Sequence, residues 1–143
     1  MTLRGITIGL LATAFFAGTI AVLVAAFAEP RVQRFGQIIG LKTEKVEEYK
    51  KLHAAVWPSV LKKIKECNIR NYSIFLKEVD KGKFYLFAYF EYTGSDFQAD
   101  MARMAADPET QKWWKETDPC QQSIPLKGDK EWWAAMPEVF HTD

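Results

Sequence analysis

His53 is the side chain in this sequence whose type and spacing best suit proton transfer near neutral pH. It follows Tyr49 by four residues and precedes Trp57 by four, a spacing that places side chains on one face of a helix. A histidine on such a face can also be a hydrogen-bonded core residue, so the pattern by itself leaves both roles open. We interpret the second histidine, His141, as a strand-end or tail residue.

Aromatic side chains with polar tips are the second chemically useful group. Tyr49 and Tyr72 carry hydroxyls, and Trp113 and Trp114 carry indoles. Such rings can lie against the apolar face of a sugar while hydroxyl and imidazole groups meet its polar edge. Adjacent helical residues point about 100° apart, so at most one of the two tryptophans faces a given pocket, and both could simply pack. This composition suits a sugar pocket.

Several functional classes lose their usual support. The sequence has no GxGxxG, GxxxxGK[ST], GxSxG or HExxH motif and no dense His, Cys or carboxylate cluster, so nucleotide-binding, metallohydrolase and serine hydrolase functions are not indicated. With 19 Lys plus Arg against 18 Asp plus Glu, a large basic face for nucleic acid is not expected. Cys67 and Cys120 are compatible with one disulfide or with two buried thiols.

The elements that must position these residues begin with a predicted strand over 32–41. Thr43 is the expected N-cap of a helix whose apolar stripe continues to Ile64, with Pro58 predicted to kink or break it. A hairpin is predicted from strands over 72–79 and 84–92.

Two more helices and a final strand follow the predicted hairpin. Ser95 and Gln98 have the form of a capping box for the first helix. Asp107 is the expected cap of the second, with Pro108 in its first position. Residues 118–130 are predicted as a loop, and a last strand is predicted around 138–141.

The order strand, helix, strand, strand, helix, strand predicts an α+β, ferredoxin-like βαββαβ fold with helices on one face of an antiparallel sheet. The second hairpin strand, FYLFAYFEY, is apolar or aromatic at nearly every position, so both of its faces are expected to be buried. A second copy of the chain is the simplest cover for the outer face. We therefore expect a homodimer whose sheets either pack together or form a shared barrel.

Residues 1–28 differ from the rest of the chain because they hold one charged side chain, Arg4. An uncharged apolar run follows it and ends in Ala26-Phe27-Ala28, the pattern of a cleaved export signal. An uncleaved membrane anchor is the alternative, because the run is long enough to span a bilayer. We therefore expect a globular domain over 29–143 that is exported, periplasmic or extracellular, with membrane contact only through residues 1–28 if they are retained.

The globular part resembles the L-rhamnose mutarotase family over about residues 34–140. The matching pieces occur in the family's order, and the combination is more specific than any one of them. They are Glu48-Tyr49 with His53, Val56-Trp57-Pro58, Asn71 to Leu76, Leu86-Phe87-Ala88, Trp113-Trp114 and Glu138-Val139-Phe140.

This resemblance implies a small dimeric αβ-barrel enzyme that interconverts the α and β anomers of L-rhamnose without a metal or an organic cofactor. It implies that His53 is the catalytic proton donor, that Tyr49 and Tyr72 bind sugar, and that Trp113 and Trp114 line the site. The composition of residues 118–133 leaves L-fucose or another deoxyhexose open as substrate. A haem-binding monooxygenase of the same fold and a non-catalytic sugar-binding module are the competing hypotheses.

Overall fold

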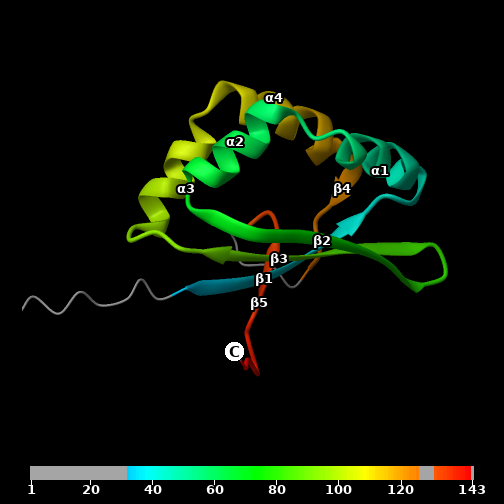
Figure 1. The fold of residues 1–143 in the computed structure, drawn as a ribbon. Coiled ribbons are helices and arrows are strands. Elements are labelled where there is room, and N and C mark those ends of the chain that lie inside the picture. Colours follow the sequence, from blue (N-terminus) through cyan, green and yellow to red (C-terminus); the bar gives the residue numbers. More distant parts are fainter. Residues whose placement is uncertain (1–31, 126–130, 143) are drawn as a thin grey trace, which may run out of the picture.

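The computed structural model describes residues 32–125 and 131–142, in which one layer of helices covers one face of an antiparallel sheet (Figure 1). The strands are β1 (Gln33–Leu41), β2 (Ile69–Asp80), β3 (Lys83–Tyr92), β4 (Gln121–Gln122) and β5 (Ala134–Met136). The helices are α1 (Val46–Ala54), α2 (Pro58–Glu66), α3 (Phe97–Ala105) and α4 (Pro108–Thr117), with 3-10 turns η1 (Thr43–Lys45) and η2 (Asp118–Cys120). The predicted α+β, ferredoxin-like arrangement is confirmed.

The sheet has the strand order β2-β3-β1, and both β4 and β5 pair with the remaining edge of β1. All pairings are antiparallel, and Ile39 lies opposite Leu86 on the face that meets the helices. The final strand predicted around 138–141 is wrong, because β5 ends at Met136. Pro137 follows it and has no N–H to continue the ladder, and the chain runs away from the sheet on the side opposite the helices (Figure 1).

The first long helical stretch is two helices, so Pro58 breaks it. α1 ends at Ala54, Ala55 leaves the helical conformation with φ −140° and ψ 52°, and Trp57 is extended with ψ 135°. Trp57 is extended because proline disfavours the helical conformation in the residue before it. Pro58 then occupies the first turn of α2, where its missing N–H costs nothing.

Two of the three predicted caps differ in the structure. Thr43 does not cap a helix: it begins η1, and its hydroxyl donates to the Gly82 carbonyl at 2.6 Å. Asp96, not Ser95, caps α3, because its carboxylate accepts the Ala99 N–H at 3.0 Å. Asp107 caps α4 as predicted and accepts the Thr110 N–H at 2.9 Å.

The core between helices and sheet consists of two clusters of buried side chains. The first contains Tyr49 and Cys120, and the second contains Cys67 and Met104. Both cysteines are buried free thiols, which settles the alternative that the sequence left open.

A buried carboxylate ties the start of β2 to α3. Asp100 accepts hydrogen bonds from the Asn68 amide at 2.7 Å and the Tyr92 hydroxyl at 2.8 Å, and it pairs with Arg103 at 2.6 Å. Asn68 sits in the left-handed region with φ 58°, where the chain turns from α2 into β2. The bonds to Asp100 therefore hold the turn that starts β2.

The predicted export segment, residues 1–28, lies outside the described residues, as do residues 126–130 of the predicted loop. The described rest of that loop begins with η2 and β4, so it is partly ordered into the sheet edge. Within 32–125 and 131–142, no helix combines the length and apolar character needed to cross a membrane.

Candidate active site

His53 occupies the last turn of α1, where the helix itself fixes its ring. Its Nδ1 lies 3.0 Å from the carbonyl oxygen of Tyr49, one turn earlier, and the two rings stack with centroids 4.0 Å apart. A carbonyl only accepts, so Nδ1 carries the hydrogen of this bond. Nε2 is then the ring nitrogen left for a substrate.

Trp113 covers the His53 imidazole from α4. Its ring meets the imidazole edge-on with centroids 5.4 Å apart, and it meets Trp57 in the same way at 5.4 Å. Trp57 was predicted to share a helical face with His53, and this is wrong because α1 ends before it. It reaches the same aromatic cluster from the start of α2, through Trp113.

Burial sets the charge state of this imidazole. His53 is half-buried, and the loss of water around it lowers its pKa below the usual 6.5, although the bond to the Tyr49 carbonyl opposes the shift. The neutral form with an Nε2 lone pair is therefore dominant at pH 7.

Tyr72 reaches the helix-facing side of the sheet because β2 is bulged. The register with β3 shifts between Arg70 and Ser73, and Asn71 in this interval has φ 49°. The Asn71 amide points to the outer face, where it donates to Glu91 at 2.7 Å, while the Tyr72 ring packs edge-on against buried Phe90. The extra residue shifts the alternation of the strand and brings Tyr72 inward.

The Tyr49 and Tyr72 hydroxyls share one environment. Burial raises the pKa of Tyr49 well above 10, and the nearby Tyr72 raises it further. Burial also raises the pKa of Tyr72 to about 12, although the residue as a whole is 42% exposed. Both phenols are thus neutral hydrogen-bonding groups at physiological pH.

Trp113 and Trp114 separate as their spacing on a helix requires. Trp113 is buried against His53, whereas Trp114 is 37% exposed and lines a neighbouring cavity. The structure therefore brings Tyr49, Tyr72, His53 and Trp113 together, with Trp114 on an adjoining wall.

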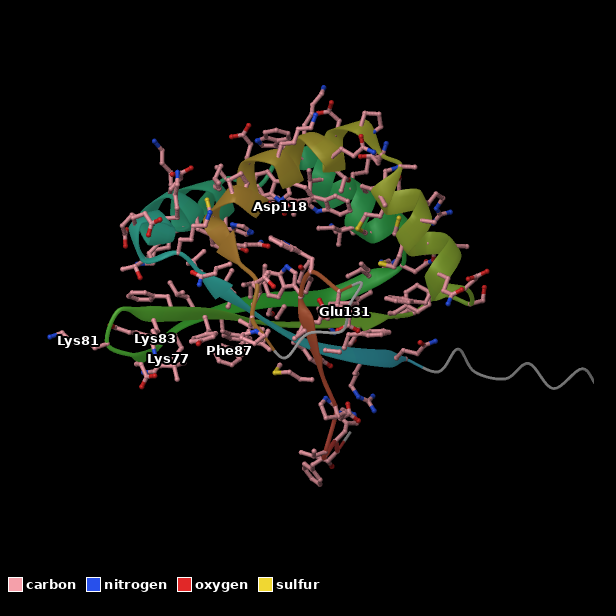
Figure 2. All side chains as sticks on the ribbon, turned by 180° about the vertical axis from the view of Figure 1, so that it is seen from behind. Lys77, Lys81, Lys83, Phe87, Asp118 and Glu131 are labelled. Carbon is pink, nitrogen blue, oxygen red and sulfur yellow. The ribbon has the colours of Figure 1, made fainter. Side chains whose placement is uncertain are left out.

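Three residues near this group had no sequence signal. The Gln121 amide interacts with the Tyr49 hydroxyl, and Trp132 donates its indole N–H to Gln121 at 2.6 Å. Asp118 begins η2 just after α4 (Figure 2); it is exposed, but partial loss of water around its carboxyl raises its pKa. Asp118 and Gln121 lie in the region predicted as a loop, where polar residues have no periodicity that would predict their position. Trp132 lies just beyond that region and joins the group through its long-range hydrogen bond to Gln121.

The arrangement can bind and transfer protons on a neutral polar ligand. It offers one imidazole with a free nitrogen, two neutral phenols and an indole wall. Among the residues that the structure describes, no three His, Cys, Asp or Glu side chains gather as a metal ion would need.

Comparison with known proteins identifies the family. The family model described as L-rhamnose mutarotase matches residues 34–142. L-rhamnose mutarotases of Oceanobacillus iheyensis and Bacillus subtilis are each 33% identical over 116 residues, which is 78% of this chain and all of theirs. That of Ligilactobacillus salivarius is 35% identical over 113 residues, covering 77% of this chain and 97% of its own.

A crystal structure of an L-rhamnose mutarotase from Formosa agariphila has the same fold. It superposes with a TM-score of 0.58 at 23% identity and covers 78% of this chain and 99% of its own. The family-model match to residues 34–142 includes every strand and helix described above, apart from the first residue of β1. The chain therefore belongs to the L-rhamnose mutarotase family.

Proposed function

We propose that this protein interconverts the α and β anomers of L-rhamnose by opening and reclosing the sugar ring, with His53 as the proton-transferring group. The observation that carries the proposal is the His53 imidazole, whose Nδ1 is held by the Tyr49 carbonyl while Nε2 remains for a ligand. The family supplies the substrate, since the relatives are named L-rhamnose mutarotase.

The reaction needs two proton transfers at one carbon. Breaking the C1–O5 bond requires a proton on O5, and forming the aldehyde requires loss of the proton from the anomeric hydroxyl. Rotation about C1–C2 then presents the other carbonyl face, and reclosure inverts C1. General acid–base help of about 10²- to 10⁴-fold is sufficient for a reaction that already proceeds in water.

His53 can serve both transfers because O1 and O5 are bonded to the same carbon. Neutral His53 takes the anomeric proton on Nε2 and, as the protonated imidazole, donates a proton to O5. The exchange rate therefore rises with pH through the lowered pKa of His53 and levels off above it. A rate that falls with pH in that range would mean that the reaction starts from the protonated imidazole.

The aromatic groups have binding roles in this proposal. The hydroxyls of Tyr49 and Tyr72 orient sugar hydroxyls, and Trp113 and Trp114 cover the ring. The substrate is uncharged, so neutral phenols and indoles match it without a charged field.

Saturation-transfer NMR on the purified protein tests the proposed function. Exchange between the two anomeric signals of L-rhamnose should be faster than in buffer alone. Faster exchange for L-fucose than for L-rhamnose would assign the alternative substrate, and binding without faster exchange would assign a sugar-binding module. A haem Soret band that disappears in His53→Ala would favour a monooxygenase.

A homodimer is part of the proposal because the outer sheet face carries exposed apolar side chains. Phe75 is 62% exposed and pairs across the strands with Phe87, which Figure 2 shows on the face away from the helices. Met136 lies near Gly36 and is also exposed. A second copy packed on this face would remove these side chains from water.

Export is the remaining part of the proposal, and it rests on residues 1–28 alone. If the signal is cleaved after Ala28, the mature protein begins at Glu29. Mass spectrometry of the natively produced protein tests this, because an intact Met1 terminus in a membrane fraction would assign an anchor instead.

A further inference from the structure

A cavity of about 490 Å³ adjoins the candidate site between the helix layer and the sheet. It lies between the two core clusters, since Trp133 packs on the cluster that contains Tyr49 and Met104 belongs to the other. Its volume is in the range of pockets that hold small ligands. The residues that line it are Gln37, Met101, Met104, Ala105, Trp114, Glu131, Trp132 and Trp133.

The lining combines open indole faces with a few polar groups. Trp132 is 43% exposed and Trp114 is 37% exposed, so each residue keeps surface that a ligand could contact. Gln37 lies on β1 opposite Ala88, on the helix-facing side of the sheet. Glu131 adds a carboxylate where the C-terminal segment meets the sheet (Figure 2). Apolar rings with a carboxylate and an amide at their edge match the two sides of a sugar.

Trp132 is tied to the His53 end by a chain of contacts. Its indole N–H donates to the Gln121 side-chain oxygen at 2.6 Å. The Gln121 amide in turn interacts with the Tyr49 hydroxyl and opposes the rise in its pKa, as an N–H donated to that oxygen does. Tyr49 stacks on His53 with centroids 4.0 Å apart. Trp114 makes a second link, because its neighbour Trp113 contacts His53.

We propose that this cavity holds the C4–C6 edge of the sugar while C1 and O5 lie at His53, and that Trp132 is a specificity-determining wall of it. This inference rests on the proposed function and deepens it. The Trp132 indole lies against the apolar face and the C6 methyl of the deoxyhexose, and Glu131 and Gln37 accept hydrogen bonds from its remote hydroxyls. Gln121 is a positioning residue that fixes Trp132 relative to Tyr49.

The proposal predicts that the protein distinguishes two sugars that differ by a single hydroxyl group. L-mannose is L-rhamnose with a hydroxyl on C6, and that hydroxyl would lose water against an indole without gaining a partner. The wild-type protein should favour L-rhamnose over L-mannose, and the preference should shrink when the indole is removed.

The test in the full-length protein compares Trp132→Ala and Trp132→Phe with the control Leu61→Ala, an exposed apolar residue on α2 outside the cavity. KM and kcat for both sugars come from saturation-transfer NMR. We expect Trp132→Ala to raise KM for L-rhamnose about tenfold, equivalent to about 1.4 kcal/mol, with a much smaller change in kcat. Trp132→Phe keeps a flat ring and should raise KM less, and Leu61→Ala should leave KM unchanged.

An unchanged KM for L-rhamnose in a folded Trp132→Ala protein would overturn the inference, as would an undiminished preference over L-mannose. If Trp132→Ala does not fold, Trp132→Phe decides by the same criteria. If the wild type accelerates neither sugar, the proposed function fails. Dissociation constants from ligand-observed NMR then judge the cavity separately: about tenfold weaker L-rhamnose binding by the variant supports it, and equal binding overturns it.

Discussion

Replacing Asn71 with valine tests whether the bulge in β2 places Tyr72 in the site. Asn71 has φ 49°, a conformation that asparagine tolerates and a β-branched residue does not. A valine can relieve the strain by returning the strand to regular alternation. That change would turn Tyr72 toward the outer face, away from Tyr49.

The expected magnitude combines two losses. Forcing valine into the left-handed region costs roughly 1–2 kcal/mol. Loss of the exposed hydrogen bond from Asn71 to Glu91 costs about 0.5 kcal/mol. Together, at about 1.5 to 2.5 kcal/mol, they correspond to a fall in Tm of about 6 to 11 °C for a domain of this size.

Asn71→Gly is the matched control. Glycine loses the same hydrogen bond but accepts a positive φ without strain. Glycine also loses more backbone entropy on folding than valine, which lowers the stability of the glycine variant. The difference in stability between the two variants is therefore a lower bound on the strain in the valine variant. Thermal unfolding gives the stabilities, and saturation-transfer NMR gives KM for L-rhamnose. We expect a higher Tm and a lower KM for glycine than for valine. Equal Tm and KM in the two variants would refute the reasoning that the left-handed bulge positions Tyr72.

Three other predictions concern pH and assembly. Burial lowers the pKa of His53, so the folded protein binds fewer protons than the unfolded chain. The free energy of unfolding should therefore decrease as the pH drops below 6.5. Chemical denaturation should show a smaller decrease over the same pH range for His53→Gln. Hydrogen bonds from Asn68 and Tyr92 hold the pKa of Asp100 below 3.8. The ionised carboxylate should therefore stabilise the fold above that pH, and this contribution should be lost on acidification. Asp100→Asn should have a lower Tm at pH 7, and its Tm should decrease less on acidification. Phe75→Glu should convert a dimer to a monomer in gel filtration with light scattering without lowering the monomer's helix content, and an unchanged mass would argue against this interface.

Local patterns predicted most of the fold. The apolar stripe, the turn residues of the hairpin and the Asp107-Pro108 pair each fix a nearby element, so the strand and helix order followed from them. Caps were less predictable: Ser95 and Asp96 are both good capping residues, and tertiary packing decides between them. The last strand was misplaced because Pro137 ends the pairing that the apolar residues after it suggested.

The site was predictable where spacing on one helix sufficed. Tyr49 and His53 share α1, so their position on one helical face followed from the sequence, and the structure shows their rings stacked. The position of Trp57 did not follow from the sequence, because α1 ends at Ala54 and Trp57 lies in the extended segment before α2. Gln121 and Trp132 join the site through pairing at the sheet edge and through a long-range hydrogen bond, and neither leaves a local pattern.

The most direct test of the central claim is the anomer exchange rate of L-rhamnose with His53→Ala against the wild type. Saturation-transfer NMR at equal protein concentration measures it at a pH above the His53 pKa. We expect the exchange rate with the variant to be about 10²-fold or more below that of the wild type, close to the rate in buffer, while the variant keeps its fold. Exchange as fast as in the wild type would contradict the assignment of His53 as the proton-transferring group.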